Sequence, residues 1–213
     1  MSALGAHPAV EAQGEILVRQ SPEAQRRLVR AALAPGRRVT ARGFKTKMKD
    51  VAEPDDLRAA IVELNALVIH MRRADLLRLA LSRINARRLH DATGRWNRTA
   101  DMPESGAVPV TTEELQTALE ACVDEVAKVE TFVESVSGDV IDIRYADVLR
   151  APEDVLESVQ RAIGVEPRTV RSGVVKNTGE DLRPWLPDFD DWRRRFAETP
   201  FAAAFEVDPR QEH

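Results

Sequence analysis

A short apolar run that ends at two arginines constrains the fold of this chain more than any other segment. Residues 67–71 predict a buried strand, Arg72 and Arg73 follow it, and a helix-period pattern then covers residues 75–92. Gly94 comes just after this pattern and suits the left-handed backbone at the end of a helix. An arginine at a strand end and the positive N-terminus of a helix can together hold a phosphate. The segment therefore predicts an α/β protein with a site for an anion.

The arginines around this segment are in large excess over acidic residues. Residues 72–98 contain eight arginines and two acids, Asp75 and Asp91. Residues 1–100 carry 19 Lys and Arg against 10 Asp and Glu, whereas residues 101–213 carry 12 against 25. A basic first half favours a polyanionic ligand, and a solvated basic surface explains the same pattern equally well.

Helix-period segments alternate with short apolar runs along the rest of the chain, which indicates an α/β fold with a mostly parallel sheet. Helix starts are marked by Ser21-Pro22 and by a capping box of Thr111 and Glu114. We expect further helices at residues 21–34, 53–64, 111–137 and 152–163, and strands at residues 39–48 and 140–143. The aromatic tail is expected to pack over the sheet as a docked C-terminal helix. A chain of 213 residues is long enough for one domain, which we expect to span residues 1–213.

The composition is typical of a protein in a reducing compartment. The single cysteine, Cys122, cannot form an internal disulfide and falls on the apolar stripe of a predicted helix. No apolar run approaches the roughly 20 residues that cross a bilayer. The N-terminal residues do not resemble a signal peptide. We expect a cytoplasmic protein with no membrane span.

Several segments, taken in order, resemble the PAPS-dependent sulfotransferases, most closely the bacterial branch that sulfates sugars and lipids. The run RRADLLRLALS, followed by TGRW, is similar to the strand and helix that bind the 3′-phosphate of PAPS (3′-phosphoadenylyl sulfate) in that family. HPAVEAQGEIL resembles the region after its first helix, and GFKTKM its second strand. RYADVLRAPEDVLESVQRAIGV is similar to its tyrosine-marked strand and the next helix, and VKNTGEDL with DWRRRFAETPF to its C-terminal segment.

The resemblance implies a P-loop-NTPase-like parallel sheet flanked by helices, and transfer of a sulfuryl group from PAPS to a hydroxyl of a carbohydrate or small metabolite. It also implies that the first strand of the family and its 5′-phosphosulfate loop are missing here, because Met1 falls in the helix that follows that loop. Arg171-Ser172-Gly173 is only a superficial match to the loop. We therefore expect the chain as written to be inactive, with unpaired sheet edges that lower its stability. No metal is expected.

Arg73 and Ser82 are the residues that match the 3′-phosphate ligands of the family. A helix that begins near Asp75 places Arg78, Ser82 and Asn85 on one face. A second face, directed to the core, combines Leu77, Ala80, Leu81 and Ile84. The alternative is a solvated arginine face with an incidental serine. Arg72 is a weaker candidate for the same phosphate.

Glu15 is the candidate general base, because the resemblance places there a glutamate that takes the proton of the acceptor hydroxyl. An ordinary surface or capping glutamate is the alternative. His7 could assist, although His7-Pro8 is better explained as a turn.

Four other residues are weaker candidates. Lys45 and Lys47 share one face of the strand expected at residues 39–48, where they could line an anionic pocket or a wet sheet edge. Trp96 is expected to be a packing anchor rather than a platform for adenine. Lys176 lies on the segment that folds over the nucleotide in relatives.

Two other functions remain open from the sequence. One is a non-catalytic relative of the sulfotransferases that binds a nucleotide or a protein partner. The other, nucleic-acid binding through the arginine-rich helix, is disfavoured because the net charge is −4 and the helix lacks interleaved aromatic residues. Neither the acceptor nor the oligomeric state can be read from any pattern in the chain.

Overall fold

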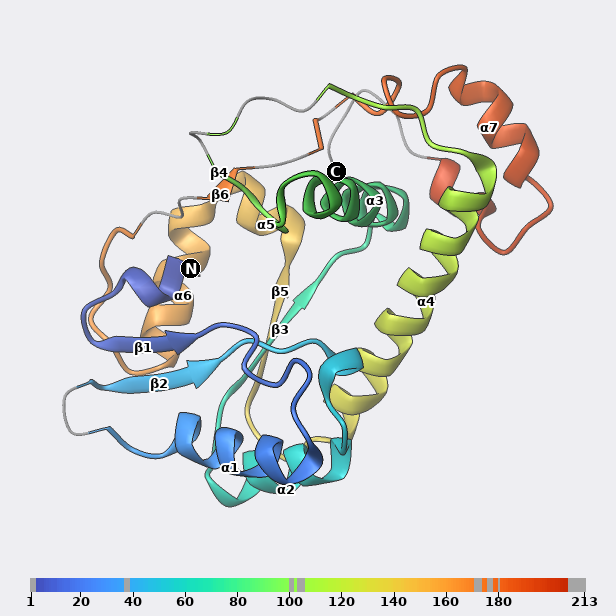
Figure 1. Cartoon of the computed structure of the whole chain (residues 1–213). Helices are drawn as coiled ribbons and strands as arrows, with labels where there is room; N and C mark the ends of the chain where they lie inside the picture. Colours follow the sequence, from blue (N-terminus) through green and yellow to red (C-terminus); the bar gives the residue numbers. More distant parts are fainter. Residues whose placement is uncertain are drawn as a thin grey trace. The chain divides into compact units, whose positions relative to one another are not determined.

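The computed structural model (Figure 1) describes residues 3–36, 39–99, 102, 106–170, 174–175, 178–179 and 181–206. Its contacts divide the chain into two compact units. Unit 1 consists of Met1–Arg72 and Glu125–Ser172, and unit 2 of Arg73–Asp124 and Gly173–His213. The expected single sulfotransferase-like domain over residues 1–213 stays a prediction.

Unit 1 contains two separate parallel sheets of two strands each. In the first, β1 (Val10–Gln13) pairs with β2 (Ala41–Phe44), and in the second, β3 (Val68–Arg72) pairs with β5 (Val140–Arg144). The helices of this unit are η1 (Ala3–Ala6), α1 (Pro22–Leu33), η2 (Met48–Asp50), α2 (Pro54–Glu63), α5 (Tyr145–Arg150) and α6 (Pro152–Ala162). The C-terminal part of α4 (Thr112–Ser135) also belongs to unit 1. A mixed α/β protein with short parallel strands is thereby confirmed.

The strand expected at residues 39–48 was predicted too long. β2 ends at Phe44, and Met48–Asp50 form a 3₁₀ helix instead. The last bond between the two segments runs from the Lys45 N–H to the Gln13 carbonyl at 3.1 Å. Because β1 itself ends at Gln13, the residues after Lys45 have no strand opposite them on that side.

The helices of unit 1 begin where local chemistry predicts. Ser21 Oγ accepts a hydrogen bond from the Ala24 N–H at 3.3 Å, and Pro22 occupies the first helical position of α1. Helices α1 and α2 pack against each other around a small apolar cluster. Its buried members are Leu17, Val29, Leu57, Ala60, Ile61 and Val136.

β3 lies where it was expected, but it is not the buried strand that its apolar run predicts. Ile69 is 37% exposed and Met71 is 54% exposed, whereas His70 is buried. Within the part of the chain that the structure describes, β3 pairs with one strand only, β5 (Figure 1). Side chains alternate along a strand, so Ile69 and Met71 point to the exposed face of this sheet and His70 points to the covered face.

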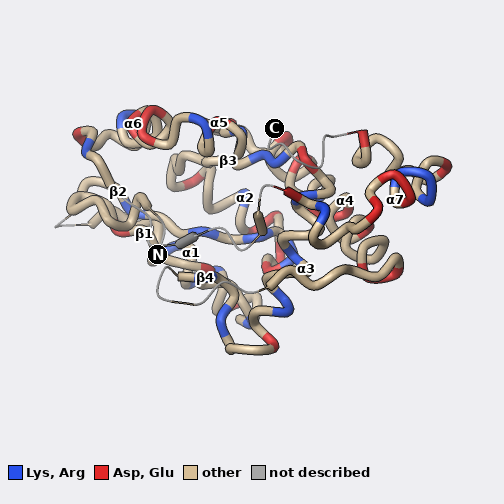
Figure 2. Tube along the Cα trace, turned by 90° about the horizontal axis from the view of Figure 1, so that it is seen from above, with Lys and Arg blue, Asp and Glu red and all other residues tan. Residues whose placement is uncertain are grey.

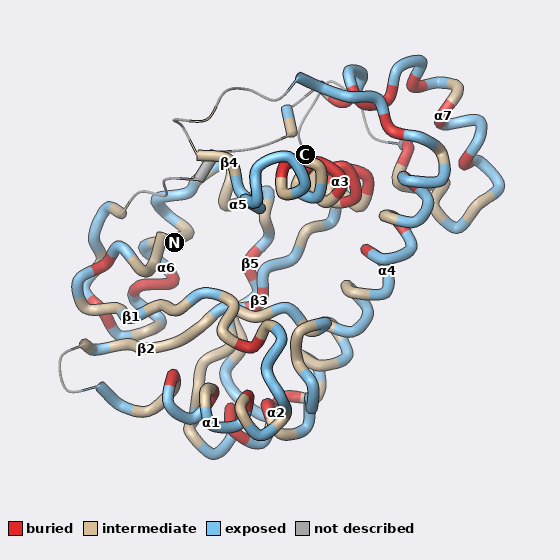
Figure 3. The backbone as a smooth tube through the Cα atoms, in the orientation of Figure 1, coloured by how far each residue is buried: buried red, intermediate tan, exposed pale blue. Residues whose placement is uncertain are grey.

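Unit 2 is built around α3 (Leu76–Thr93), in which Figure 3 shows buried residues interspersed with exposed ones. Asp75 caps the start of α3, and Gly94 ends it with a φ of 73°. The capping box of α4 forms as predicted: the Thr111 N–H donates to Glu114 Oε2 at 3.0 Å, and the Glu114 N–H donates to Thr111 Oγ1 at 3.1 Å. The remaining elements are β4 (Arg98–Thr99), which pairs antiparallel with β6 (Val174–Val175), α7 (Phe189–Phe196) and η3 (Ala202–Phe205).

The aromatic tail packs against helices rather than over a sheet, which corrects the sequence prediction. Phe189, Trp192, Phe196 and Phe205 join one core cluster with the buried faces of α3 and α4. Cys122 lies in the same cluster, fully buried, as expected for a packed thiol. The outer face of α7 has acidic residues in its first turn and arginines in its last turn, which Figure 2 shows as a red stretch next to a blue one. A helix with one aromatic face and one charged face stays docked by its aromatic side.

None of the described helices is both long and apolar enough to cross a membrane.

Candidate functional site

The polar face of α3 is more buried than the sequence suggests. Arg78 is only 4% exposed and Asn85 is also buried, whereas Ser82 between them is half-buried. The alternative of a solvated arginine face is therefore wrong for Arg78. The core face of Leu77, Ala80, Leu81 and Ile84 is buried as predicted. The core face of α3 is covered and the polar face partly so, and Ser82 lies on the polar face, as predicted from the helical period.

A carboxylate caps the start of this helix. Asp75 Oδ1 accepts a hydrogen bond from the Arg78 N–H at 2.8 Å, and Asp75 Oδ2 lies 3.1 Å from Arg78 Nε. This ion pair was not predicted, although the i,i+3 spacing of Asp75 and Arg78 suggests it. The negative carboxylate balances the positive end of the helix dipole. It also orders the turn that precedes Ser82.

Ser82 Oγ has no hydrogen-bond partner among the described residues. Its neighbour on the same face, Asn85, donates from Nδ2 to Thr178 Oγ1 at 2.8 Å. A half-buried hydroxyl between two fixed polar side chains can donate to a bound oxyanion without rearrangement. The contact of Thr178 with Asn85 was not predicted, because the two residues are far apart in the sequence.

Arg73 precedes the cap residue Asp75 and is half-buried. It already has an interaction partner within the structure. Its expected pairing with Ser82 around one phosphate stays a prediction. Arg72, the weaker candidate, is directed elsewhere: its Nε lies 3.1 Å from Asp142 Oδ1. Two other segments that the sequence singled out, Lys176 and Arg171-Ser172-Gly173, lie outside the described residues.

Glu15 is held by the two lysines that follow β2. Glu15 Oε1 lies 3.1 Å from Lys45 Nζ and 3.1 Å from Lys47 Nζ. Lys47 Nζ also donates to Glu15 Oε2 at 3.2 Å. Partial burial by itself raises the pKa of the Glu15 carboxyl, but the hydrogen bonds and charges of Lys47 and Lys45 outweigh it and leave the pKa below its ordinary value of 4.5. Glu15 is therefore a carboxylate at neutral pH.

Lys45 and Lys47 both contact Glu15, but the strand on which they were expected to share one face does not reach them. They lie in the loop after β2 rather than on one face of a strand. Together with Glu15 they form a cluster with one net positive charge, which suits an anionic ligand as well as an acceptor hydroxyl.

His7 cannot assist Glu15 as a proton carrier. Its Nε2–H donates to the Glu166 carbonyl at 2.9 Å, and its Nδ1 accepts from the Ala9 N–H at 3.1 Å. Both ring nitrogens of this buried imidazole are thus used to tie the turn after η1 to the segment that follows α6.

Trp96 is a surface residue rather than the packing anchor that was expected. It is 51% exposed and stacks on His90, with 4.1 Å between the ring centroids. The left-handed turn at Gly94 reverses the chain and brings the indole onto the last turn of α3.

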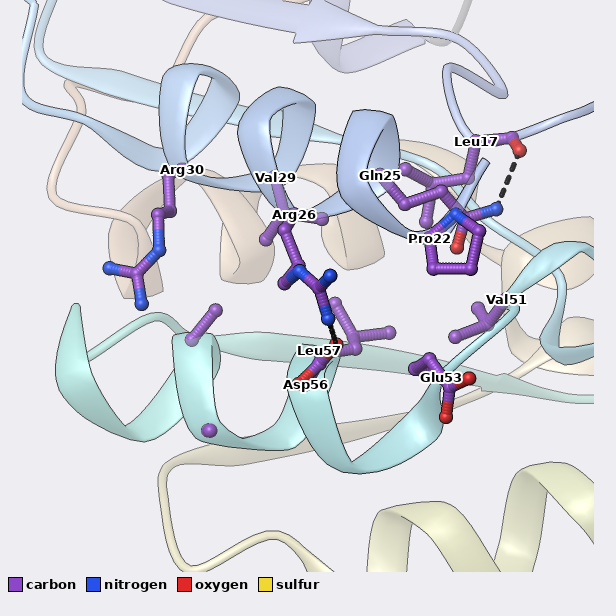
Figure 4. Close-up of a pocket in the computed structure, with 12 residues that line it drawn as sticks. Leu17, Pro22, Gln25, Arg26, Val29, Arg30, Val51, Glu53, Asp56 and Leu57 are labelled. Carbon is purple, nitrogen blue, oxygen red and sulfur yellow. Dashed lines mark hydrogen bonds and ion pairs between the residues drawn. The ribbon is translucent and has the colours of Figure 1, made fainter. Parts of the chain in front are cut away.

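A small cavity lies between α1 and α2 (Figure 4), and none of the predicted site residues lines it. Its volume is about 70 Å³, whereas pockets for drug-sized ligands measure roughly 300 Å³ or more. The Arg26–Asp56 ion pair, with a distance of 2.6 Å, bridges the two helices beside it. A space of this size cannot hold a nucleotide, so it is a packing defect between two helices.

His70 and Asp142 form a pair that the sequence did not predict. His70 Nδ1–H donates to Asp142 Oδ1 at 2.8 Å, and the two residues are register partners in β3 and β5. They are far apart in the chain, so only the pairing of the strands brings them together.

No group of three or more His, Cys, Asp and Glu side chains within the described residues is arranged to hold a metal ion. Comparisons with protein-family models, with curated proteins and with solved structures find no match to this chain.

Proposed function

We propose that this protein is a PAPS-dependent sulfotransferase that moves a sulfuryl group to a hydroxyl of a carbohydrate or small metabolite, on a P-loop-NTPase-like sheet. The observation that supports this most is the hydroxyl of Ser82, which has no partner among the described residues. It lies on the buried polar face of α3, a helix that begins directly after an arginine-ended strand. A strand-end arginine followed by a helix that carries an inward hydroxyl is the arrangement that the resemblance associates with a nucleotide 3′-phosphate.

In this proposal Arg73 supplies two parallel N–H donors to the 3′-phosphate and Ser82 supplies one O–H donor. Glu15 accepts the proton of the acceptor hydroxyl as its oxygen bonds to sulfur, and the bond between sulfur and the 5′-phosphate oxygen breaks to release 3′,5′-ADP. A carboxylate of lowered pKa is ready to accept a proton at neutral pH, but it is a weak base. The rate then depends on positioning and on stabilisation of the leaving phosphate.

The second candidate is a non-catalytic relative that binds the nucleotide without transfer. One observation favours it: both oxygens of Glu15 are engaged by lysine ammonium groups. A base held in this way must give up an ion pair before it can receive a proton. Both candidates require the same 3′-phosphate site, so a nucleotide-binding measurement tests both of them. A substitution of Glu15 distinguishes them, because only the sulfotransferase needs its carboxylate as a base.

The first experiment is a titration of the purified 213-residue protein with 3′,5′-ADP, followed by thermal shift and calorimetry. We expect saturable binding that weakens about tenfold to a hundredfold in Ser82→Ala, because a hydrogen bond to a charged group contributes about 1.5–3 kcal/mol. Arg73→Ala should weaken it at least as much. Arg87→Ala, which removes an exposed arginine from the same helix, is the control and should leave affinity unchanged.

Equal weakening in Arg73→Ala and Arg87→Ala would mean that general positive charge attracts the nucleotide, and it would refute the proposed site. Glu15→Gln should leave the affinity for 3′,5′-ADP unchanged. We expect little or no turnover from the 213-residue chain as written, and any release of 3′,5′-ADP from PAPS that is measured should be abolished by the same substitution. Transfer that persists in Glu15→Gln would exclude Glu15 as the base.

A further inference from the structure

The β3–β5 sheet carries four ionisable side chains on one face. His70 and Asp142 are register partners, and so are Arg72 and Arg144. Partners in a parallel pair point to the same side, and residues two apart in a strand do as well. Figure 1 shows β3 and β5 side by side, and Arg72 and Arg144 are the last residues of these two strands, so they lie opposite each other at the carboxyl end of the sheet.

This face has more positive than negative charge. Asp142 Oδ1 receives both the His70 Nδ1–H at 2.8 Å and the Arg72 Nε–H at 3.1 Å. Arg144 is exposed, and its side chain makes no hydrogen bond or ion pair with any described residue. The Asp142 carboxylate therefore accepts from both His70 and Arg72. No acidic side chain among the described residues pairs with the positive charge of Arg144.

Two like charges directly opposite each other destabilise a strand pair, since neighbouring strands lie only about 4.8 Å apart. Such a pair is favourable when an anion bridges it. The pair also lies at the carboxyl ends of parallel strands, where α/β proteins bind their ligands. Asp142 fixes the Nε edge of Arg72 and leaves its two terminal nitrogens free to donate among the described residues.

We propose that Arg72 and Arg144 bind a phosphate-type oxyanion, free or carried as a monoester, at the carboxyl ends of β3 and β5. Two guanidinium forks match the oxygens of a tetrahedral oxyanion in a way that lysines or a single arginine do not. His70 and Asp142 act as positioning residues, because they set the orientation of Arg72. This site does not depend on the proposed binding of 3′,5′-ADP by Arg73 and Ser82.

The test is calorimetric titration of the whole 213-residue protein with inorganic phosphate, at a constant ionic strength of about 20 mM so that screening is weak. We expect saturable binding that weakens about tenfold or more in Arg72→Gln and in Arg144→Gln. Arg150→Gln is the matched control, because Arg150 is an exposed arginine of the same unit that already pairs with Asp147. It should not change the affinity.

A second titration with glycerol 3-phosphate distinguishes the two sources of the oxyanion. Tighter binding than inorganic phosphate indicates a monoester, and weaker binding indicates the free anion; glycerol itself should not bind. Without ligand, Arg144→Gln should unfold at the same or a higher temperature than the parent, whereas an arginine with a structural role would lower it.

Three results would overturn the site: no saturable binding of either anion, equal loss of affinity in Arg150→Gln, or a lower unfolding temperature of Arg144→Gln without ligand. Loss of phosphate binding in Arg73→Ala would show instead that the anion occupies the nucleotide site. The two proposals can fail independently. An Arg144→Gln variant that loses its affinity for phosphate but keeps its affinity for 3′,5′-ADP would show that the two anions bind at different sites.

Discussion

The ion pair at the start of α3 offers the sharpest test of how this protein is held together. Arg78 and Asp75 have side chains that are 5% and 10% exposed, and their charged atoms are 3.1 Å apart. Exposed ion pairs contribute about 0–1 kcal/mol, whereas removal of one partner from a buried pair costs about 3–5 kcal/mol. Because both side chains are buried, the cost for buried pairs applies to Asp75 and Arg78.

We expect Arg78→Met to lower the free energy of unfolding by about 3 kcal/mol, the lower end of that range. The value is not higher because Asp75 Oδ1 keeps its hydrogen bond from the backbone N–H of residue 78, 2.8 Å away. For a chain of this size the loss corresponds to a fall in melting temperature of roughly 6–12 °C. Methionine preserves the length of the side chain, so the cavity contribution stays small.

The assay is urea denaturation followed by circular dichroism, on a double-mutant cycle of Asp75→Asn and Arg78→Met. The asparagine introduced by Asp75→Asn would still cap the helix, since asparagine and aspartate are equally good caps, so the cycle isolates the charge. We expect a coupling energy of about 2 kcal/mol. Arg87→Met, on the exposed side of the same helix, should change stability by less than about 0.5 kcal/mol. A coupling energy below about 0.5 kcal/mol would refute the buried pair.

Two further predictions concern unit 1. Gln25→Leu should lower the free energy of unfolding, measured in urea, by about 2–4 kcal/mol. The reason is that the buried Gln25 side chain donates to two backbone carbonyls and accepts from the Ala52 N–H. A similar loss in the exposed control Gln20→Leu would contradict this reason. Glu15→Gln should cost up to about 1 kcal/mol at neutral pH. The pKa of Glu15 is lowered in the folded protein, so its stabilisation is present above the unfolded value and is lost as the pH falls below 4.5; a difference between parent and variant that persists in acid would contradict the assignment.

Helix boundaries could be predicted because the interactions that set them are local. Ser21 with Pro22, Asp75, Gly94 and the Thr111/Glu114 box act within a turn or two of the chain. Their geometry therefore follows from the residue types and their spacing. The helical period likewise predicted that Ser82 shares a face with Arg78 and Asn85.

Burial on that face could not be predicted in the same way. An arginine on a helix is ordinarily solvated, and Arg78 is buried because the tertiary structure covers its side of α3. Trp96 shows the reverse: an aromatic residue that is ordinarily packed lies at the surface, stacked on His90. Hydrophobicity gives an average tendency for each residue type, whereas burial depends on what packs above each position.

Strand pairing is the second property that sequence periodicity did not supply. The apolar run before Arg72 predicts a strand, but not which strand lies beside it. Parallel strands need a long crossover, so their partners are distant in the chain. The register that places Arg144 opposite Arg72, and Asp142 opposite His70, exists only after that crossover has folded.

The sequence by itself determined where most helices begin and end, and that a strand-end arginine is followed by a helix on which Ser82 shares a face with Arg78 and Asn85. Capping, helical period and strand alternation depend on contacts between near neighbours, so they can be read along the chain. Only the tertiary structure decided that Arg78 is buried with Asp75, that Glu15 is held by Lys45 and Lys47, and that two arginines meet at the end of the β3–β5 sheet. The lysine cluster and the arginine pair depend on contacts between distant residues, and the burial of Arg78 depends on the packing around α3; none of these can be read from local spacing.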